Sequence, residues 1–197
     1  MEVFLLSANL PPVEGRQELL RHSAFSFLVE GISRACSHQL VRHRPASYSQ
    51  QSQRYVAMKN FPFVEPESVK GIKVEVEGRE LSFKEMMELT GKFYEALVER
   101  GVPKEDARFV LPNACTTRIV FTMNGEELVH FLRLRTCSRA QWEIREMAIE
   151  ILKLLRKNFP GLFDKVGPNC YYLGYCTEGK KSCGRPGEVR KFFSELK

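Results

Sequence analysis

A hydrogen-bonding segment, residues 42–54, places the tightest constraint on how this chain can fold. It contains three guanidiniums, those of Arg42, Arg44 and Arg54, together with His43 and several serine, tyrosine and glutamine side chains. A packed core excludes so many polar groups, because each buried donor or acceptor without a partner costs about 1–3 kcal/mol. The segment must therefore lie at a surface or around a ligand, and the apolar core must come from the flanking sequence.

The side chains of this segment suit a phosphorylated ligand. Arginine forks bind phosphate in bidentate fashion, and hydroxyls and amides such as those of Ser47, Ser52 and Gln50 can read a base or a sugar. A solvated basic loop beside a helix end is the alternative, and it would account for Arg-His-Arg alone. It gives no reason for paired glutamines, spaced serines and the closing Arg54-Tyr55. We therefore interpret the segment as a nucleotide site.

Length and charge bound the class of protein. The 197 residues, of which 43% are apolar, can form one globular domain over residues 1–197 with a real core. A net charge of +6 favours anionic partners, namely nucleotides, nucleic acid or acidic cofactors, without choosing among them. The run Met1–Leu6 is too short for a signal peptide, and no apolar run reaches membrane-spanning length. We expect a cytoplasmic protein that makes no contact with a membrane.

Three of the six cysteines, Cys170, Cys176 and Cys183, gather among glycines and prolines near the C-terminus. Their spacings of six and seven residues lack the paired Cys-x-x-Cys arrangement of a zinc ribbon. A reducing cytosol keeps such cysteines as thiols. The sequence therefore predicts free thiols and no bound metal.

Apolar periodicity and capping residues predict an alternation of strands and helices. Period-two patterns predict strands over Ala24–Val29, Ile72–Glu77 and Thr117–Met123. Helical spacing begins at Ile32 and ends before Pro45, so the basic triplet lies just past a helix C-terminus, where partial negative charge stabilises cations. Three further helix starts are expected, each at a polar residue with Glu or Gln three positions on: Ser82 with Glu85, Asn124 with Glu127, and Ser138 with Gln141.

The buried stripe of the helix that follows Asn124 ends on a charge. Leu128, Phe131 and Leu132 mark this stripe, and the next position on it is Arg135. An unpaired guanidinium on an inward face costs several kcal/mol, so Arg135 needs an anion, a carbonyl-rich ligand or a carboxylate. A buried ion pair with a nearby Glu, or a side chain that extends outward at the helix end, are the alternatives.

Residues 42–55 resemble the signature of the flavin-dependent thymidylate synthases, usually written Arg-His-Arg, two residues, Ser, then Ser five positions on and Arg two after that. Further similarity lies in residues 107–113, 130–135 and 140–145. The resemblance covers most of the chain from about Phe25 to Ile151. Ser49 and Gln50 stand where many members have Asn and Glu, and Arg139 stands where some have His. Members of the family usually have a longer stretch ahead of the first strand, with residues that contact flavin or folate. The residues from Pro11 to Arg21 are not matched to any of those contacts.

The resemblance implies an α+β domain with a central, mostly antiparallel sheet flanked by long helices. It implies reductive methylation of deoxyuridylate (dUMP) with 5,10-methylenetetrahydrofolate as carbon donor, and with FAD, reduced by NADPH, as hydride donor. Arg135 matches the arginine that holds negative charge on the N3/O4 side of the uracil, a form of preorganised electrostatic catalysis. Active sites between the subunits of a homotetramer are implied as well.

The same residue-to-residue match assigns the binding residues. The positions expected to hold dUMP are Gln39, Arg42, Gln50, Ser52, Gln53, Arg54, Arg108 and Arg135. The positions expected to contact FAD are Arg42, His43, Arg44, Gln50, Asn124, His130 and Arg139. Asn124 can instead be only a helix cap, and His130 only a core histidine. Ser52 lacks an evident His-Asp partner that would activate it as a nucleophile, so a hydrogen bond to substrate is the preferred role.

Two other functions are open to a chain of this kind. A non-catalytic basic protein could bind RNA or DNA through the same arginines, with a strong dependence on salt. The arginines are spread over separate elements, however, and the aromatic residues have core spacing instead of forming an exposed stacking platform, so we expect no nucleic-acid partner. An enzyme that binds nucleotide without flavin would leave the matches after residue 107 unexplained.

Overall fold

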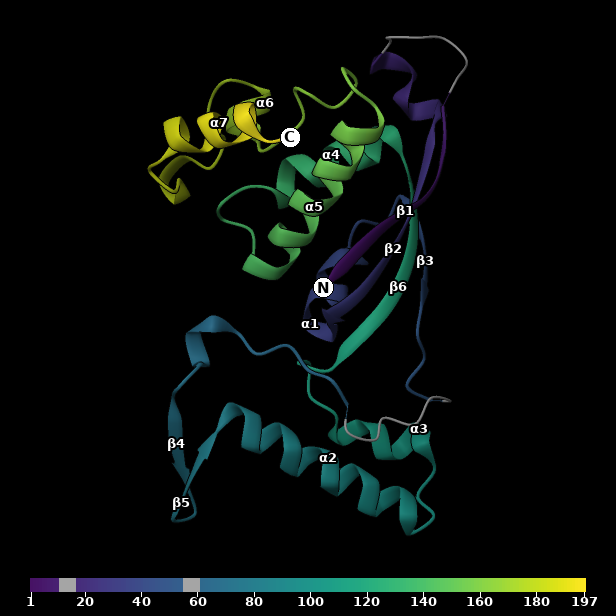
Figure 1. The fold of residues 1–197 in the computed structure, drawn as a ribbon, viewed down its shortest axis with the longest axis vertical. Coiled ribbons are helices and arrows are strands. Elements are labelled where there is room, and N and C mark those ends of the chain that lie inside the picture. The colour runs from purple at the N-terminus through teal and green to yellow at the C-terminus, as the bar shows by residue number, and fades with distance from the viewer. Residues whose placement is uncertain (11–16, 55–60) are drawn as a thin grey trace. The chain divides into compact units, whose positions relative to one another are not determined.

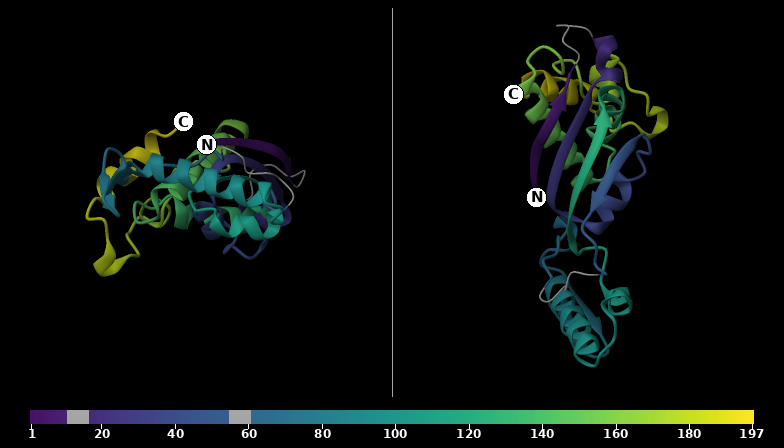
Figure 2. Two further views of the ribbon diagram at one scale, coloured as in Figure 1. Left: turned by 90° about the horizontal axis from the view of Figure 1, so that it is seen from below. Right: turned by 90° about the vertical axis from the view of Figure 1, so that its right-hand side faces the viewer.

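Four antiparallel strands form the larger sheet of the computed structural model, which describes residues 1–10, 17–54 and 61–197. Across the sheet their order is β1 (Glu2–Asn9), β2 (Ala24–Ser33), β6 (Thr116–Asn124) and β3 (Ala46–Gln50) (Figure 1 and Figure 2). The expected α+β class with an antiparallel sheet is confirmed. Pro11 to Arg16 and Tyr55, which the sequence analysis discussed, lie outside the described residues.

The chain divides into two compact units. The first comprises residues 1–29, 39–49 and 120–197, and the second comprises residues 30–38 and 50–119. The prediction of a single domain over residues 1–197 stays a prediction. The helical elements of the first unit are η1 (Gln17–His22), α4 (Gly125–Arg135), α5 (Trp142–Asn158), α6 (Asn169–Tyr172), η4 (Gly179–Lys181) and α7 (Pro186–Glu195).

The core of the first unit lies between strand residues and the helices α4 and α5, which contact each other (Figure 1). Phe25, Phe27 and Val29 alternate with half-buried residues on β2 and are fully buried. The Phe27 ring stacks on that of Phe121 at 5.3 Å between centroids. Burial of one such side chain stabilises the fold by about 1.5–3 kcal/mol. The period-two pattern of β2 and the helical stripe on α4 thus meet in one apolar layer.

The second unit is built around the long helix α2 (Phe83–Glu99). The other elements here are β4 (Lys73–Val76), β5 (Arg79–Ser82), α3 (Lys104–Ala107), the 3-10 turns η2 (Glu67–Val69) and η3 (Arg108–Val110), and most of α1 (Arg34–Leu40). β4 and β5 pair as a hairpin through a two-residue turn, in which Glu77 and Gly78 both have positive φ. A small core contains Phe61, Met87, Tyr94, Ala107 and Cys115.

Most of the expected elements are present, with some corrections. The Ser82–Glu85 capping box and the Asn124 cap are confirmed. Ile32 belongs to β2 instead of the following helix, because the strand runs on to Ser33. Ser138 does not cap α5: the cap is Gln141, whose side chain accepts from the amides of Glu143 and Ile144. The strands β1 and β3 and the helix α7 were not predicted.

Candidate functional site

The basic triplet follows directly on helix α1, as the sequence predicts. His43 N–H donates to the Leu40 carbonyl at 3.1 Å, so the chain turns away at the helix end. Arg42 and Arg44 are exposed, whereas His43 between them is buried. The Tyr48 hydroxyl on β3 reaches the Leu40 and His43 carbonyls at 2.9 and 2.7 Å, and burial raises its pKa to about 12. The triplet is therefore fixed by its backbone, while its two arginines face outward.

His43 connects two charged side chains of helix α4. Arg135 Nε donates to His43 Nε2 at 3.0 Å, and His43 Nδ1 lies 3.2 Å from Glu127 Oε1. The imidazole also packs edge-on against the Phe131 ring at 4.9 Å between centroids. Arg135, on the inward stripe, thus has a histidine acceptor, and the carboxylate expected as its alternative partner bonds to that histidine instead.

The geometry fixes the protonation state of His43. Because Nε2 accepts a hydrogen bond from a guanidinium, the proton of the neutral ring resides on Nδ1 and is donated to Glu127. Burial lowers the pKa of His43, the Arg135 charge lowers it further, and the Glu127 bond partly opposes both. The contact with Glu127 is thus a hydrogen bond to a neutral imidazole, which orients the imidazole toward Arg135.

The other positions expected at the flavin have different surroundings. Asn124 Oδ1 accepts from the Glu127 amide at 2.8 Å, so this residue caps α4. His130 is exposed, with its ring 6.3 Å from that of His43. Arg139 is exposed and borders a small cavity near the C-terminus. His130 is therefore not a core histidine.

In the second unit two arginines that were expected to hold dUMP bond to one acidic residue. Arg54 donates from Nε and Nη2 to Glu105 Oε2, at 3.0 and 2.7 Å, and Arg108 Nε donates to the Glu105 carbonyl at 3.0 Å. The Arg54 and Glu105 side chains are 49% and 51% exposed. A pair this exposed contributes only about 0.2–1 kcal/mol, so an incoming anion can replace the carboxylate at little cost.

The polar residues that precede Arg54 are held by short bonds within the same unit. The Gln50 amide donates to the hydroxyls of Ser37 and Thr117 at 2.8 and 3.3 Å. Ser52 Oγ accepts from the Arg54 amide at 3.2 Å. Gln53 is half-buried, as is Gln39 in the first unit. Ser52 therefore stabilises the backbone at Arg54.

The predicted site residues are divided between the two compact units, one group in each. The first unit contains Gln39, Arg42 and Arg135, and all the expected flavin contacts except Gln50. The second unit contains Gln50, Ser52, Gln53, Arg54 and Arg108. Convergence of both groups on one ligand stays a prediction. Sequence reasoning missed the two carboxylates that organise the groups. Glu127 had been assigned only to a helix start, and Glu105 lay in a short helix between motifs.

The chain matches a family model described as "Thymidylate synthase complementing protein" over residues 12–161. It is 52% identical over 184 residues to a flavin-dependent thymidylate synthase of Geobacter sulfurreducens, covering 92% of this chain and 77% of the relative. The corresponding protein of Clostridium tetani is 41% identical over 191 residues (91% and 76%), and that of Pyrococcus abyssi 46% over 185 residues (88% and 73%). Within the described ranges, every helix is too short or too polar to cross a bilayer.

Proposed function

The chain belongs to the thymidylate synthase complementing protein family, and we propose that its two arginine groups hold dUMP and a flavin for methylation of the uracil ring. It is a flavin-dependent thymidylate synthase, EC 2.1.1.148. The proposal extends this activity to the residues and co-substrates: FAD as the flavin, NADPH as its reductant, and 5,10-methylenetetrahydrofolate as the carbon donor.

The observation that supports the catalytic assignment most directly is the hydrogen-bonded series Glu127, His43, Arg135. Carbon C5 of uracil is a weak nucleophile unless negative charge can gather on the N3/O4 side of the ring. A guanidinium held in a fixed orientation stabilises that charge as it develops, without having to reorient during the reaction. His43 fixes one N–H of Arg135 at 3.0 Å, and Glu127 fixes the orientation of His43. We assign Arg135 as the catalytic residue and the other two as positioning residues.

The exposed arginines of the second unit suit the phosphate of dUMP. Arg54 already binds a carboxylate through two nitrogens, and a phosphate oxygen can take the place of that carboxylate. Arg108 donates to the backbone carbonyl of the same glutamate, Glu105, and adds a second positive charge. Gln39, Gln50, Ser52 and Gln53 supply hydrogen-bonding groups for the sugar and the base.

The donors of the first unit fit a flavin dinucleotide. Arg42 and Arg44 are exposed on either side of a buried residue, which suits the two negative charges of a pyrophosphate. His43 and the exposed His130 and Arg139 belong to the same unit and to the proposed FAD set, whereas Asn124 acts chiefly as a helix cap. Gln50, the remaining proposed FAD contact, belongs to the second unit. When bound, the reduced flavin supplies the hydride that completes the methyl group.

Exposed apolar side chains support the proposed homotetramer. In the second unit Ile72, Val74 and Val76 on the hairpin and Met86 and Phe93 on α2 are 44–58% exposed. Met87 and Tyr94 belong to the core, and Met86 and Phe93 are available to another subunit. The cytoplasmic location and the lack of a nucleic-acid partner stay predictions.

A flavin spectrum and a methylation assay test the proposal together. We expect the purified protein to be yellow, to bleach on anaerobic addition of NADPH, and to convert dUMP to thymidylate when methylenetetrahydrofolate is added. A colourless protein that FAD cannot reconstitute, with affinity for RNA that falls steeply with salt, would refute the residue assignments in favour of nucleic-acid binding.

A further inference from the structure

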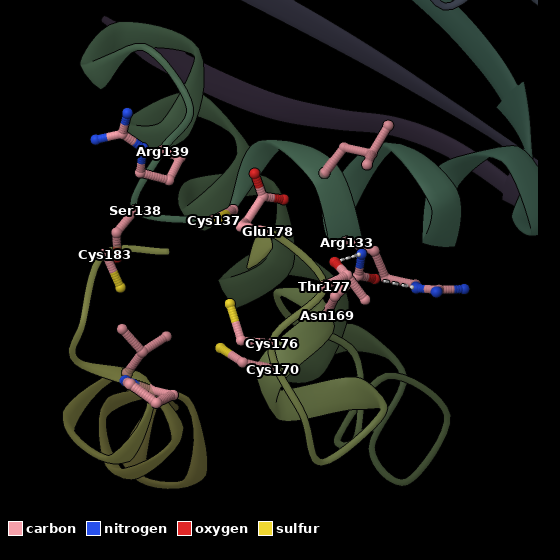
Figure 3. Close-up of a pocket in the computed structure, with 13 residues that line it drawn as sticks. Arg133, Cys137, Ser138, Arg139, Asn169, Cys170, Cys176, Thr177, Glu178 and Cys183 are labelled. Atoms are coloured by element: carbon pink, nitrogen blue, oxygen red, sulfur yellow. Dashed lines mark hydrogen bonds between the residues drawn. The ribbon is translucent and has the colours of Figure 1, made fainter. Parts of the chain in front are cut away.

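Four of the six cysteines border one small cavity in the C-terminal part of the chain. Cys137 follows helix α4, Cys170 lies in α6, and Cys176 and Cys183 lie in the connection between α6 and α7. Figure 3 shows Cys170 and Cys176 side by side facing this cavity, with Cys183 opposite them. The cavity has a volume of ≈ 20 Å³, the size of a single ion or water molecule.

The segment that supplies two of these thiols has almost no apolar core of its own. Between Tyr171 and Phe192 none of the residues, all of which the structure describes, is buried. Its regular structure is limited to the end of α6, a 3-10 turn and most of α7. Ordering such a stretch costs conformational entropy that buried apolar area usually offsets. Small segments that lack a core are commonly stabilised by a metal ion or a disulfide.

The remaining thiols of the chain have different surroundings. Cys36 and Cys115 are fully buried in the second unit, as expected of cysteines that act as small apolar residues. Cys176 and Cys183 are only half-buried, and both face the cavity. Burial raises the pKa of Cys137 and Cys170, so these thiols are protonated and poorly nucleophilic in the absence of a cation. A reactive-cysteine switch is therefore a poor explanation of the cluster.

We propose that Cys137, Cys170, Cys176 and Cys183 form a binding site for a thiophilic divalent cation, with Zn²⁺ as the expected ion, and that the ion fastens the α6–α7 segment to the end of α4. Each thiol loses its proton on binding, so four protons are released and the tetrathiolate site has a net charge of −2. Arg133, Arg139 and Glu178 line the same cavity, and together their side chains carry one excess positive charge that opposes part of the −2. The proposal does not depend on the proposed function.

In this proposal the cysteine side chains turn toward the cation as it binds. Among the described residues, no group of three or more His, Cys, Asp or Glu side chains is already arranged to hold a metal ion. Rotation about the Cα–Cβ bond redirects a cysteine sulfur without moving the backbone, and the thiols already border a common space. Three of the four cysteines follow residue 161, where the match to the family model ends.

Metal content and cobalt spectroscopy test the proposal on the full-length protein. We expect one zinc per chain by mass spectrometry of protein purified without chelator. Co²⁺ added to the apo protein should give the sulfur-to-cobalt charge-transfer bands and the intense visible bands of a tetrahedral thiolate site. Cys176→Ala and Cys183→Ala should each lose these signals. Cys36→Ala, which removes a cysteine outside the cavity, should keep them.

A second measurement keeps the test decisive if a variant fails to fold. Zinc-loaded protein should protect four thiols from a thiol reagent that reacts with them after chelation, and its unfolding midpoint should rise with metal concentration. Substoichiometric metal with cobalt spectra that lack sulfur bands would overturn the proposal. A disulfide among these cysteines in the freshly purified protein, found by mass spectrometry without reductant, would also overturn it.

Discussion

The two arginine groups of this protein are built in opposite ways. Arg135 donates to a histidine whose side chain is 5% exposed, and this histidine in turn bonds a carboxylate that is 13% exposed. Arg54 pairs with a carboxylate at the surface, where both side chains are about half exposed. The first guanidinium is oriented by buried neighbours, and the second is held by a contact that solvent and salt can weaken.

This difference matches the two tasks that the proposed reaction sets. Charge that develops at fixed ring atoms is best stabilised by a donor whose orientation is already set. A phosphate must first be captured from solution, and an exposed guanidinium with an exchangeable partner permits that at little cost in free energy. A buried network should therefore govern turnover, and an exposed pair should govern substrate affinity.

The largest expected effect is that of Arg135→Ala. Loss of one preorganised donor to a developing oxyanion lowers kcat by roughly 10²–10³-fold. We expect the flavin absorbance to be retained, because Arg135 is assigned to dUMP alone. Thymidylate formation under saturating dUMP is the measurement. Arg118→Ala, which removes an exposed arginine paired with Glu30, is the control and should leave turnover within about twofold of wild type. Unchanged turnover in the Arg135 variant would exclude it from the mechanism.

Arg54→Ala should act on affinity instead of turnover. Loss of a charge-assisted contact of about 1.5–3 kcal/mol corresponds to a rise of roughly 10–100-fold in the KM for dUMP, with kcat little changed. The KM of the wild type should rise with ionic strength, and this dependence should be weaker in the variant. Equal losses in kcat and kcat/KM would place Arg54 with Arg135 and remove the contrast between the two groups.

The sequence predicted what local rules determine and missed what distant contacts determine. The Ser82 and Asn124 caps and the inward position of Arg135 follow from residues within a few positions of one another. The partner of Arg135 lies 92 positions away, and Glu127 and His43 are separated by 84. Local periodicity contains no information on such pairs, so the contact between His43 and Arg135 was not predicted; the assignment of His43 to the flavin stays a prediction.

A second miss has a local cause. Strand β1 has mostly exposed side chains, so it lacks the alternation of buried and exposed positions that reveals a strand in sequence. The position of Cys137 beside the late cysteines is a further long-range contact that sequence spacing could not show, because Cys137 follows helix α4 and precedes Cys170 by a stretch that includes all of α5. The prediction of free thiols without a bound metal stays a prediction.

Glu127 tests whether orientation of Arg135 through His43 matters. Glu127→Ala leaves the Nδ1 proton of a buried imidazole without its acceptor, which costs about 1–3 kcal/mol, and we expect kcat to fall roughly tenfold. Glu127→Gln keeps an acceptor oxygen at the same position and should restore most of the turnover. Failure of Gln to rescue would mean that the charge of Glu127, instead of its hydrogen bond, is what the site requires.

The pH dependence separates this positioning role from a purely structural one. The pKa of His43 lies below its ordinary 6.5 in the folded protein, so the unfolded chain binds the proton first on acidification. Stability should therefore fall as the pH drops below 6.5 toward the lowered pKa, whereas turnover should fall only as the pH approaches the lowered pKa itself, where the folded protein protonates His43. The bond to Glu127 raises this pKa, so Glu127→Ala should move the acidic limb of kcat to lower pH. If the acidic limb of kcat stays at the same pH in Glu127→Ala, protonation of His43 does not control turnover.

The smallest effect concerns Asn124, where cap and flavin contact make different predictions. Its side chain accepts from the Glu127 amide, so Asn124→Ala should lower the free energy of unfolding by about 1 kcal/mol. The same change loosens the first turn of α4, which includes Glu127, and should lower kcat only a few-fold. Asn124→Asp and Asn124→Ser keep a capping oxygen and should restore both quantities. If all three variants lose flavin affinity equally while their unfolding midpoints differ, Asn124 contacts the cofactor directly, and the buried network extends to the flavin as well as to Arg135.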